Sequence, residues 1–365
     1  MSEGATSKLV VSTRPRFQVE GQDEERLGVD LLRLEVAQDE EGLSRLSAVF
    51  RNWGRRDEDS APGFLYDDRS LLDLGKRIVV RTGESDNESV IFDGKITALA
   101  GLFPDLRPAE IRIHAEDALF QLLLRQRTRF FEQEDEAGIV SRVANDHSLS
   151  PQADAAGTQH REFWQVSQND LAFLRERARV ADARIEVSDG ALRFKPRRGQ
   201  SGGDPIRLSK EGALIHFEGM CDLAHQRTSV FVHGWSVADK EAIHESAGAS
   251  EIAAESNGGT TGPQVLDNLG WTAIEHVYLE APATTGEARS TAKSLALARG
   301  RRFLTGKGTT DGTPSLAVGK EVELLDIGDL FSGRWSVCAV RHTWNQGEGL
   351  RTHFRAERVD LGGRA

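Results

Sequence analysis

The chain has 365 residues, which predicts two to four domains because a single hydrophobic core stops growing at roughly 250–300 residues. A formal net charge of −11 argues against a protein whose main surface binds nucleic acid, since such a surface needs clustered lysine and arginine. The two cysteines and the apolar runs, all shorter than a membrane span, predict synthesis in a reducing cytoplasm and no membrane insertion.

The first third of the chain alternates apolar and polar residues in the manner of antiparallel strands. The alternation starts with LVVS from Leu9, continues to residue 50, and resumes from Ile78 to Ile113. Between these runs, residues 54–74 are charged and rich in turn formers, which predicts a surface loop. Residues 1–118 are therefore expected to form a first tube-like β domain, a sandwich or barrel.

Helical periodicity follows and predicts a small α/β domain over residues 119–205. One helix is expected in DEAGIVSRVANDH, and another in NDLAFLRERARVADA, capped by Asn169 or Ser167 and with Arg177 on its solvated side. The dipeptide Asp189-Gly190 predicts a tight hairpin turn. A linker beginning at Gly199 ends this domain.

The rest of the chain predicts a second tube-like β domain that is split by an insertion. Its strands are expected in residues 206–236 and 310–365. Residues 237–309 are rich in Ala, Ser, Gly and Thr and are expected to be an insertion that is partly loop, with one helix near its end. The string GKGTTDGTP from Gly306 is expected to be a turn.

Two stretches of the chain look like copies of one module. GKRIVV from Gly75 precedes FDGKITAL and EIRIHAED, and GKEVEL from Gly319 precedes FSGRWSVCAVRH and LRTHFRAER. The two glycines are too far apart for a solenoid repeat, so whole domains are the unit that would be duplicated. The predicted fold class is α+β, mainly β, with two duplicated antiparallel tube-like domains, a small α/β domain and an insertion.

Catalytic, cofactor and metal motifs are not found, and we predict no residue of any of these kinds. His342 and His353 were weighed as a metal pair, and Glu116 with Asp117, or Glu132 with Glu134 and Asp135, as a glycosidase acid and base; polar strand faces and solvated surface are the preferred interpretations. The arginines at positions 125, 127 and 129 and the pairs at 197–198 and 301–302 are interpreted as solvated faces or subunit salt bridges rather than a phosphate site.

Three strings in order resemble a known family. They are QNDLAFLRERARVADARIEVSDGALRFKP from Gln168, VHGWSVADKEAI from Val232, and the segment from Gly306 to Asp360. They are similar to the phage late control protein D family, which is related to the baseplate hub of contractile-tailed phages and to the N-terminal part of type VI secretion VgrG spikes. Ser236, Trp335 and Leu350 depart from residues that are usual in that pattern, but these changes are interpreted as preserving bulk and leaving the fold prediction intact.

The resemblance implies a non-enzymatic homotrimer in which three subunits with two modules each form a pseudo-sixfold ring. Such a ring would adapt a sixfold inner tube to a threefold spike, with other baseplate proteins around it, in a phage tail or a tail-derived injection particle. The spike is expected to be a separate protein. Two alternatives stay open at this point: a cell-envelope hydrolase, and an adaptor that carries a toxin through residues 237–285.

Overall fold

The computed structural model describes residues 14–83, 88–155, 157, 159–198, 203–278 and 282–362. Strands dominate and helices are the minority, which confirms the predicted α+β, mainly β class. The strand expected at Leu9 and the first four residues of the expected linker lie outside the described residues. None of the helices in the described part is both long and apolar enough to cross a membrane.

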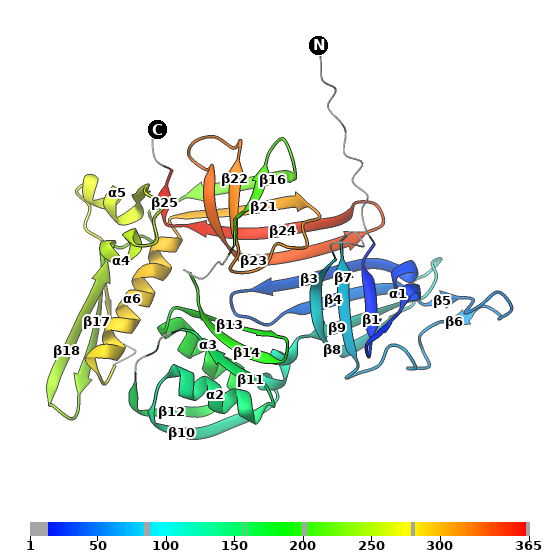
Figure 1. The fold of residues 1–365 in the computed structure, drawn as a ribbon, viewed down its shortest axis with the longest axis horizontal. Coiled ribbons are helices and arrows are strands. Elements are labelled where there is room, and N and C mark those ends of the chain that lie inside the picture. The colour runs from blue at the N-terminus through cyan, green and yellow to red at the C-terminus, as the bar shows by residue number, and fades with distance from the viewer. Residues whose placement is uncertain are drawn as a thin grey trace, which may run out of the picture.

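One sheet of 13 strands runs through both halves of the chain (Figure 1). In spatial order its strands are β16 (Leu214–Cys221), β21 (Leu304–Asp311), β24 (Gly349–Arg358), β23 (Gly333–Asn345), β3 (Leu31–Asp39), β4 (Arg45–Arg51), β9 (Glu110–Glu116), β8 (Ser89–Leu102), β7 (Arg77–Thr82), β1 (Arg16–Val19) and β2 (Gln22–Asp23). Off this path, β15 (Ile206–Ser209) pairs with β22 (Glu321–Leu325), and β22 pairs with β23.

The N-terminal and C-terminal halves meet where β23 pairs with β3. The pairing is antiparallel and runs from Ala339 opposite Asp39 to Asn345 opposite Arg33. In Figure 1 the blue β3 and the red-orange β23 lie side by side. Backbone hydrogen bonds therefore join the two β units into one sheet.

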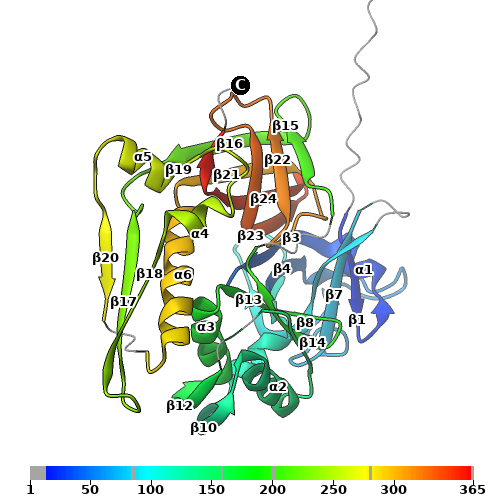
Figure 2. The same ribbon diagram turned by 60° about the vertical axis from the view of Figure 1, so that its left-hand side comes forward.

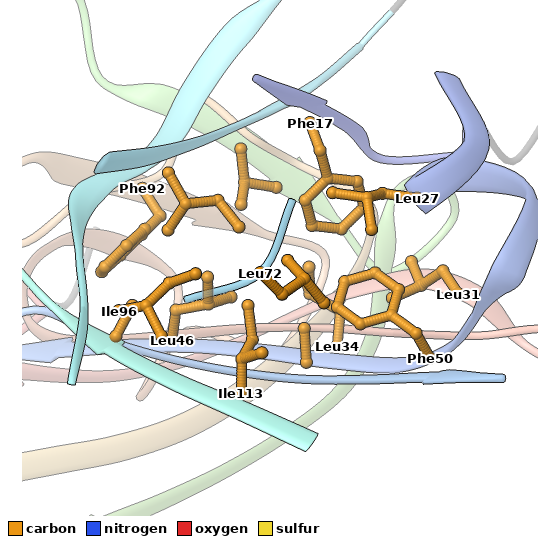
Figure 3. Close-up of a cluster of buried hydrophobic side chains, with 14 of the residues drawn as sticks. Phe17, Leu27, Leu31, Leu34, Leu46, Phe50, Leu72, Phe92, Ile96 and Ile113 are labelled. Carbon is orange, nitrogen blue, oxygen red and sulfur yellow. The ribbon is translucent and has the colours of Figure 1, made fainter. Parts of the chain in front are cut away.

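The first β unit has its own hydrophobic core, shown in Figure 3. Phe17, Phe50 and Phe92 are buried in this core, and the exposed Arg16, Arg51 and Asp93 lie next to them in the sequence, as strand alternation predicts. The helix α1 (Glu25–Asp30) contributes Leu27 to this core. The predicted loop over residues 54–74 carries a short strand pair, β5 (Trp53–Gly54) with β6 (Gly63–Phe64).

The two glycines that suggested a duplication occupy matching places. Strands β7–β8–β9 and β22–β23–β24 are both antiparallel meanders, and Gly75 and Gly319 precede them with φ angles of 82° and 77°. The Gly75 N–H donates to the Ile96 carbonyl at 2.8 Å, and the Gly319 N–H donates to the Val337 carbonyl at 2.8 Å. A β-bulge follows Ile96 and another follows Val337. The two meanders thus share their strand order, the hydrogen bond of their first glycine and the place of one bulge.

A small α/β unit follows the first β unit. Its elements are η1 (Ala118–Leu123), β10 (Gln126–Glu134), α2 (Glu136–Asp146), β11 (Ser150–Ala153), β12 (His160–Asn169), α3 (Asp170–Val180), β13 (Ala183–Ser188) and β14 (Ala191–Pro196). The Asn169 side chain caps α3 by accepting from the Ala172 N–H at 2.8 Å, as predicted. The predicted hairpin turn is also confirmed, with positive φ at Asp189 and Gly190. The prediction that Arg177 faces solvent is wrong, because it is buried beside Glu136.

The described residues of the segment 237–309 include three helices rather than the one predicted. They are α4 (Ala249–Ala253), α5 (Gly262–Asn268) and α6 (Thr285–Arg301). Strand β17 (Ser229–Ser236) pairs with β18 (Glu241–Gly248) and β20 (Ile274–Val277) in a separate sheet that packs on α6 (Figure 2). The assignment of this strand to the second tube-like domain is therefore wrong. The short strand β19 (Thr260–Thr261) pairs with β25 (Asp360–Leu361).

Residues 306–311 of the string GKGTTDGTP belong to the strand β21 (Leu304–Asp311), so the turn predicted for these residues is wrong. Added β-carbons at Gly306 and Gly308 would lie 2.4 Å and 2.2 Å from ring atoms of Phe217 and Phe354. The glycines are thus needed because aromatic rings from the neighbouring strands pack on the bare backbone. Sequence reasoning took the glycines for turn formers, since both rings come from distant segments.

Candidate assembly surfaces and binding sites

The two histidines weighed as a metal pair do not converge. His342 is buried and its Nδ1 lies 3.0 Å from the Thr352 Oγ1, while His353 is paired with Arg341 and so lies on the opposite face of the hairpin. Burial lowers the pKa of His342 to about 4. In the part of the chain that the structure describes, no three or more His, Cys, Asp or Glu side chains are grouped to hold one metal ion.

The carboxylates weighed as a catalytic pair have structural roles. Asp117 caps η1 by accepting from the Leu119 N–H at 2.9 Å and also accepts from the Ser44 N–H at 2.9 Å. Burial raises its pKa to about 6 despite these bonds. Asp135 caps α2 through the Gly138 N–H at 2.9 Å, and Glu134 pairs with Arg142 at 3.2 Å. The interpretation of all of these as simple solvated surface is corrected for Asp117, which is buried.

A cleft of about 770 Å³ lies where the large sheet meets α3 and α6. Glu40 and Glu357 line it, and each is held by an arginine: Arg197 Nε donates to Glu40 at 3.1 Å, and Arg198 Nη2 donates to Glu357 at 3.1 Å. Burial raises the pKa of Glu40 and outweighs the opposing effect of Arg197. The cleft walls thus form an ion-pair network that connects the small α/β unit to the large sheet.

A second ion-pair network lies at the end of α6. Arg301 is 1% exposed and donates to Asp182 at 2.5 Å and to Glu255 at 2.9 Å. The expectation of a solvated arginine or a subunit salt bridge is therefore wrong for Arg301, which joins three segments inside one chain. Arg127 and Arg129 similarly pair with Asp146 within the small α/β unit. Sequence spacing offers no signal for any of these partners, because each comes from a different element.

Exposed aromatic side chains gather beside the first β unit. The Trp53 and Phe64 rings lie 5.2 Å apart and those of Phe64 and Phe103 lie 6.1 Å apart, all edge to face. Phe103 is 69% exposed. We call these three residues the aromatic patch. An exposed apolar patch of this kind is typical of a protein–protein contact.

The large sheet with its two meanders, the inserted α/β unit and the helix-backed small sheet define a class of fold that solved phage tail proteins share. The 43 kDa tail protein of prophage MuSo2 from Shewanella oneidensis matches with a TM-score of 0.67 at 10% identity, covering 96% of this chain and 100% of the other. A tail protein from Neisseria meningitidis MC58 matches with a TM-score of 0.67 at 11% identity over 95% and 96% of the two chains.

A third similar structure is the Escherichia coli c3393 protein, described as a component of the type VI secretion system. It matches with a TM-score of 0.56 at 12% identity, covering 92% of this chain and 76% of the other. The chain belongs to the family described as the Alg8 N-terminal domain, whose model matches residues 57–346. Comparison with curated proteins finds no match.

Proposed function

We propose that this chain is the structural baseplate hub of a contractile injection system, in a phage tail or a tail-derived particle. In this proposal it is a homotrimer, related to the late control protein D family and to the N-terminal part of VgrG spikes. It is not an enzyme. It binds the inner tube protein on one side and a separate spike protein on the other, with other baseplate proteins around it, after synthesis in the bacterial cytoplasm.

The observation that carries the proposal is the pair of matching meanders in one continuous sheet. Gly75 and Gly319 make the same backbone hydrogen bond at the start of each meander, so each subunit presents similar β structure twice. Three such subunits around a threefold axis would present six similar units, which is the number needed to meet a sixfold tube. The fold that this chain shares with phage tail proteins supports the same conclusion.

The aromatic patch offers a surface for the contact between subunits. Trp53 and Phe64 are 43% and 41% exposed, so the patch as a whole presents apolar area to solvent in the single chain. Aromatic residues are enriched at the buried centres of protein interfaces. We place a subunit contact at this patch.

The test is the mass of the purified full chain in solution, by light scattering after size exclusion, together with electron micrographs of the particles. The expected mass is three times 40.1 kDa, and end-on views should show a six-lobed ring. Phe103→Asp should shift the mass toward the monomer, whereas the matched variant Leu330→Asp, at a residue 48% exposed on another surface, should leave the trimer intact. A wild-type chain that stays monomeric at every concentration measured would rule the trimer out.

A further inference from the structure

The small sheet β18–β17–β20 has one face on α6 and one face toward solvent (Figure 2). Side chains alternate along each strand, so the inward positions include the buried Val230, Val232 and Ile243. The outward positions include three histidines, one from each strand: His233, His244 and His276. The solvent-facing side of this sheet therefore carries three imidazoles that come from separate segments of the sequence.

The imidazole of His233 contacts both of the others. The Nδ1 atoms of His233 and His244, which are direct cross-strand partners, lie 2.8 Å apart. On its other side, the Nε2 of His233 lies 3.0 Å from the Nδ1 of His276. Both ring nitrogens of His233 therefore have a histidine nitrogen as their neighbour.

Aromatic stacking fixes the orientation of the central ring. The Tyr278 ring lies 4.4 Å from the His233 ring with an angle of 8° between the planes, and the His276 ring lies 5.2 Å from it at 25°. Phe231 stacks in turn on His276 at 5.2 Å. This row of rings restricts the rotamers of His233, which lowers the entropy cost of binding a ligand there.

Two glutamates of these strands form ion pairs on the α6 side of the sheet. Glu245 of β18 pairs with Arg289, and Glu275 of β20 pairs with Arg299, both on α6. Ion pairs with carboxylates therefore do not explain the gathering of the imidazoles on the outer face. Neutral imidazole nitrogens are ligands for zinc, copper and nickel ions.

The spacing of the nitrogens fits metal coordination. Two nitrogens bound at about 2.0–2.1 Å to one ion lie about 2.9 Å apart when they meet at the right angle of a square-planar copper or nickel site. The 2.8 Å separation of the His233 and His244 Nδ1 atoms agrees with that value. A histidine that binds a metal usually donates its other ring N–H to an acceptor, which sets its tautomer. The Nδ1 of His276 lies 3.0 Å from the His233 Nε2 and accepts from it when the Nε2 of His233 carries the proton.

We propose that His233 and His244 bind one divalent first-row transition-metal ion through their Nδ1 atoms, and that His276 positions His233 by accepting its Nε2–H. Two protein ligands leave the remaining coordination positions to water. This arrangement agrees with the finding that no three ligating side chains of the described residues surround one point. The ion would sit on the solvent-facing surface of the small sheet, away from the large sheet.

The experiment is a titration of the full chain with Cu²⁺ alone, because copper is the tightest binder in the divalent series. Calorimetry should give one equivalent of ion per chain, and the electron paramagnetic resonance spectrum should show coupling to two imidazole nitrogens. His233→Ala and His244→Ala should each abolish this binding. His276→Phe keeps a ring in the stack and should weaken binding about 10–100-fold, as expected for loss of a hydrogen-bond partner behind a ligand.

The matched control is His225→Ala, which removes an exposed histidine outside the small sheet and should leave the affinity unchanged. Circular dichroism of every variant checks that loss of binding is not loss of fold. The proposal is overturned if the His233 and His244 variants bind Cu²⁺ like the wild type, or if the wild-type spectrum shows a single coupled nitrogen.

Discussion

Gly308 shows at the scale of one residue how packing decides which side chain a strand can carry. A β-carbon added at Gly308 would lie only 2.2 Å from an atom of the Phe354 ring, so the two would overlap. Gly308→Ala should therefore lower the free energy of unfolding by about 1–3 kcal/mol, the usual range for overpacking a core. Urea denaturation of the two proteins measures the difference.

The control for this prediction is Gly212→Ala. An added β-carbon there meets its nearest neighbour at 3.7 Å, which is an ordinary contact, so the change should stay within about 0.5 kcal/mol. Equal urea midpoints for the two variants would show that the ring can move away from Gly308 without cost.

The structural role of a residue could be predicted when its partners are close in the sequence. It could not be predicted when the partners come from distant segments. Asn169 as a cap and Asp189-Gly190 as a turn follow from rules that act over a few residues, and both predictions are confirmed. Gly308 needs its bare backbone because of Phe354, which is distant in sequence, so the same glycine rule gave a wrong turn there. The burial of Arg177 and Arg301 was missed for the same reason.

At the scale of elements, His160 of β12 joins the small α/β unit to α6. Its Nε2 lies 2.8 Å from a Glu136 oxygen on α2, and its Nδ1 lies 2.5 Å from a Glu287 oxygen on α6. Burial alone would lower the pKa of His160, but the hydrogen bonds to the two carboxylates outweigh it and raise the pKa above 6.5. The charged imidazole therefore stabilises the contact between these elements.

The raised pKa predicts how stability changes with pH. Because His160 binds its proton more tightly in the folded state, its contribution is fully present below pH 6.5 and is lost as the pH rises through the folded-state value. His160→Gln should abolish this decline in the free energy of unfolding, measured by urea titration at a series of pH values from 6 upward. The control His225→Gln, at an exposed position, should keep the wild-type decline. If the free energy of unfolding fell equally with pH in the wild type and in His160→Gln, the decline could not be attributed to His160.

The histidine cluster of the small sheet could not be predicted because the hairpin that brings His233 and His244 together was not recognised in the sequence. His233 was placed in a strand, but the segment after it was interpreted as an insertion that is partly loop because it is rich in small residues. Those residues suit the real packing, since Ala288, Ala292 and Ala296 let α6 lie close to the sheet. Had the hairpin of β17 and β18 been predicted, the pairing of His233 with His244 would have followed from its register.

At the scale of the whole molecule, the two β units share both a sheet and part of a core. Strand β23 pairs with β3 across the junction, and Trp344 and Leu350 of the C-terminal half lie in the hydrophobic core of the first unit. The two similar stretches were recognised in the sequence because they repeat a local pattern. The junction was not, because strand alternation in a sequence does not say which strand lies next to which.

The shared core predicts that the two units unfold together. Trp344 is 5% exposed, so Trp344→Ala should lower the free energy of unfolding by about 3–5 kcal/mol. Since Trp344 belongs to β23 but packs in the first unit, amide hydrogen exchange should accelerate in β7–β9 as well as in β22–β24. Trp164→Ala, at a residue 56% exposed on the small α/β unit, is the matched control and should leave exchange in both meanders unchanged. Faster exchange in β22–β24 alone would mean that the β23–β3 junction does not couple the stability of the two β units. A ring of six similar units would then depend on contacts between subunits rather than on this sheet.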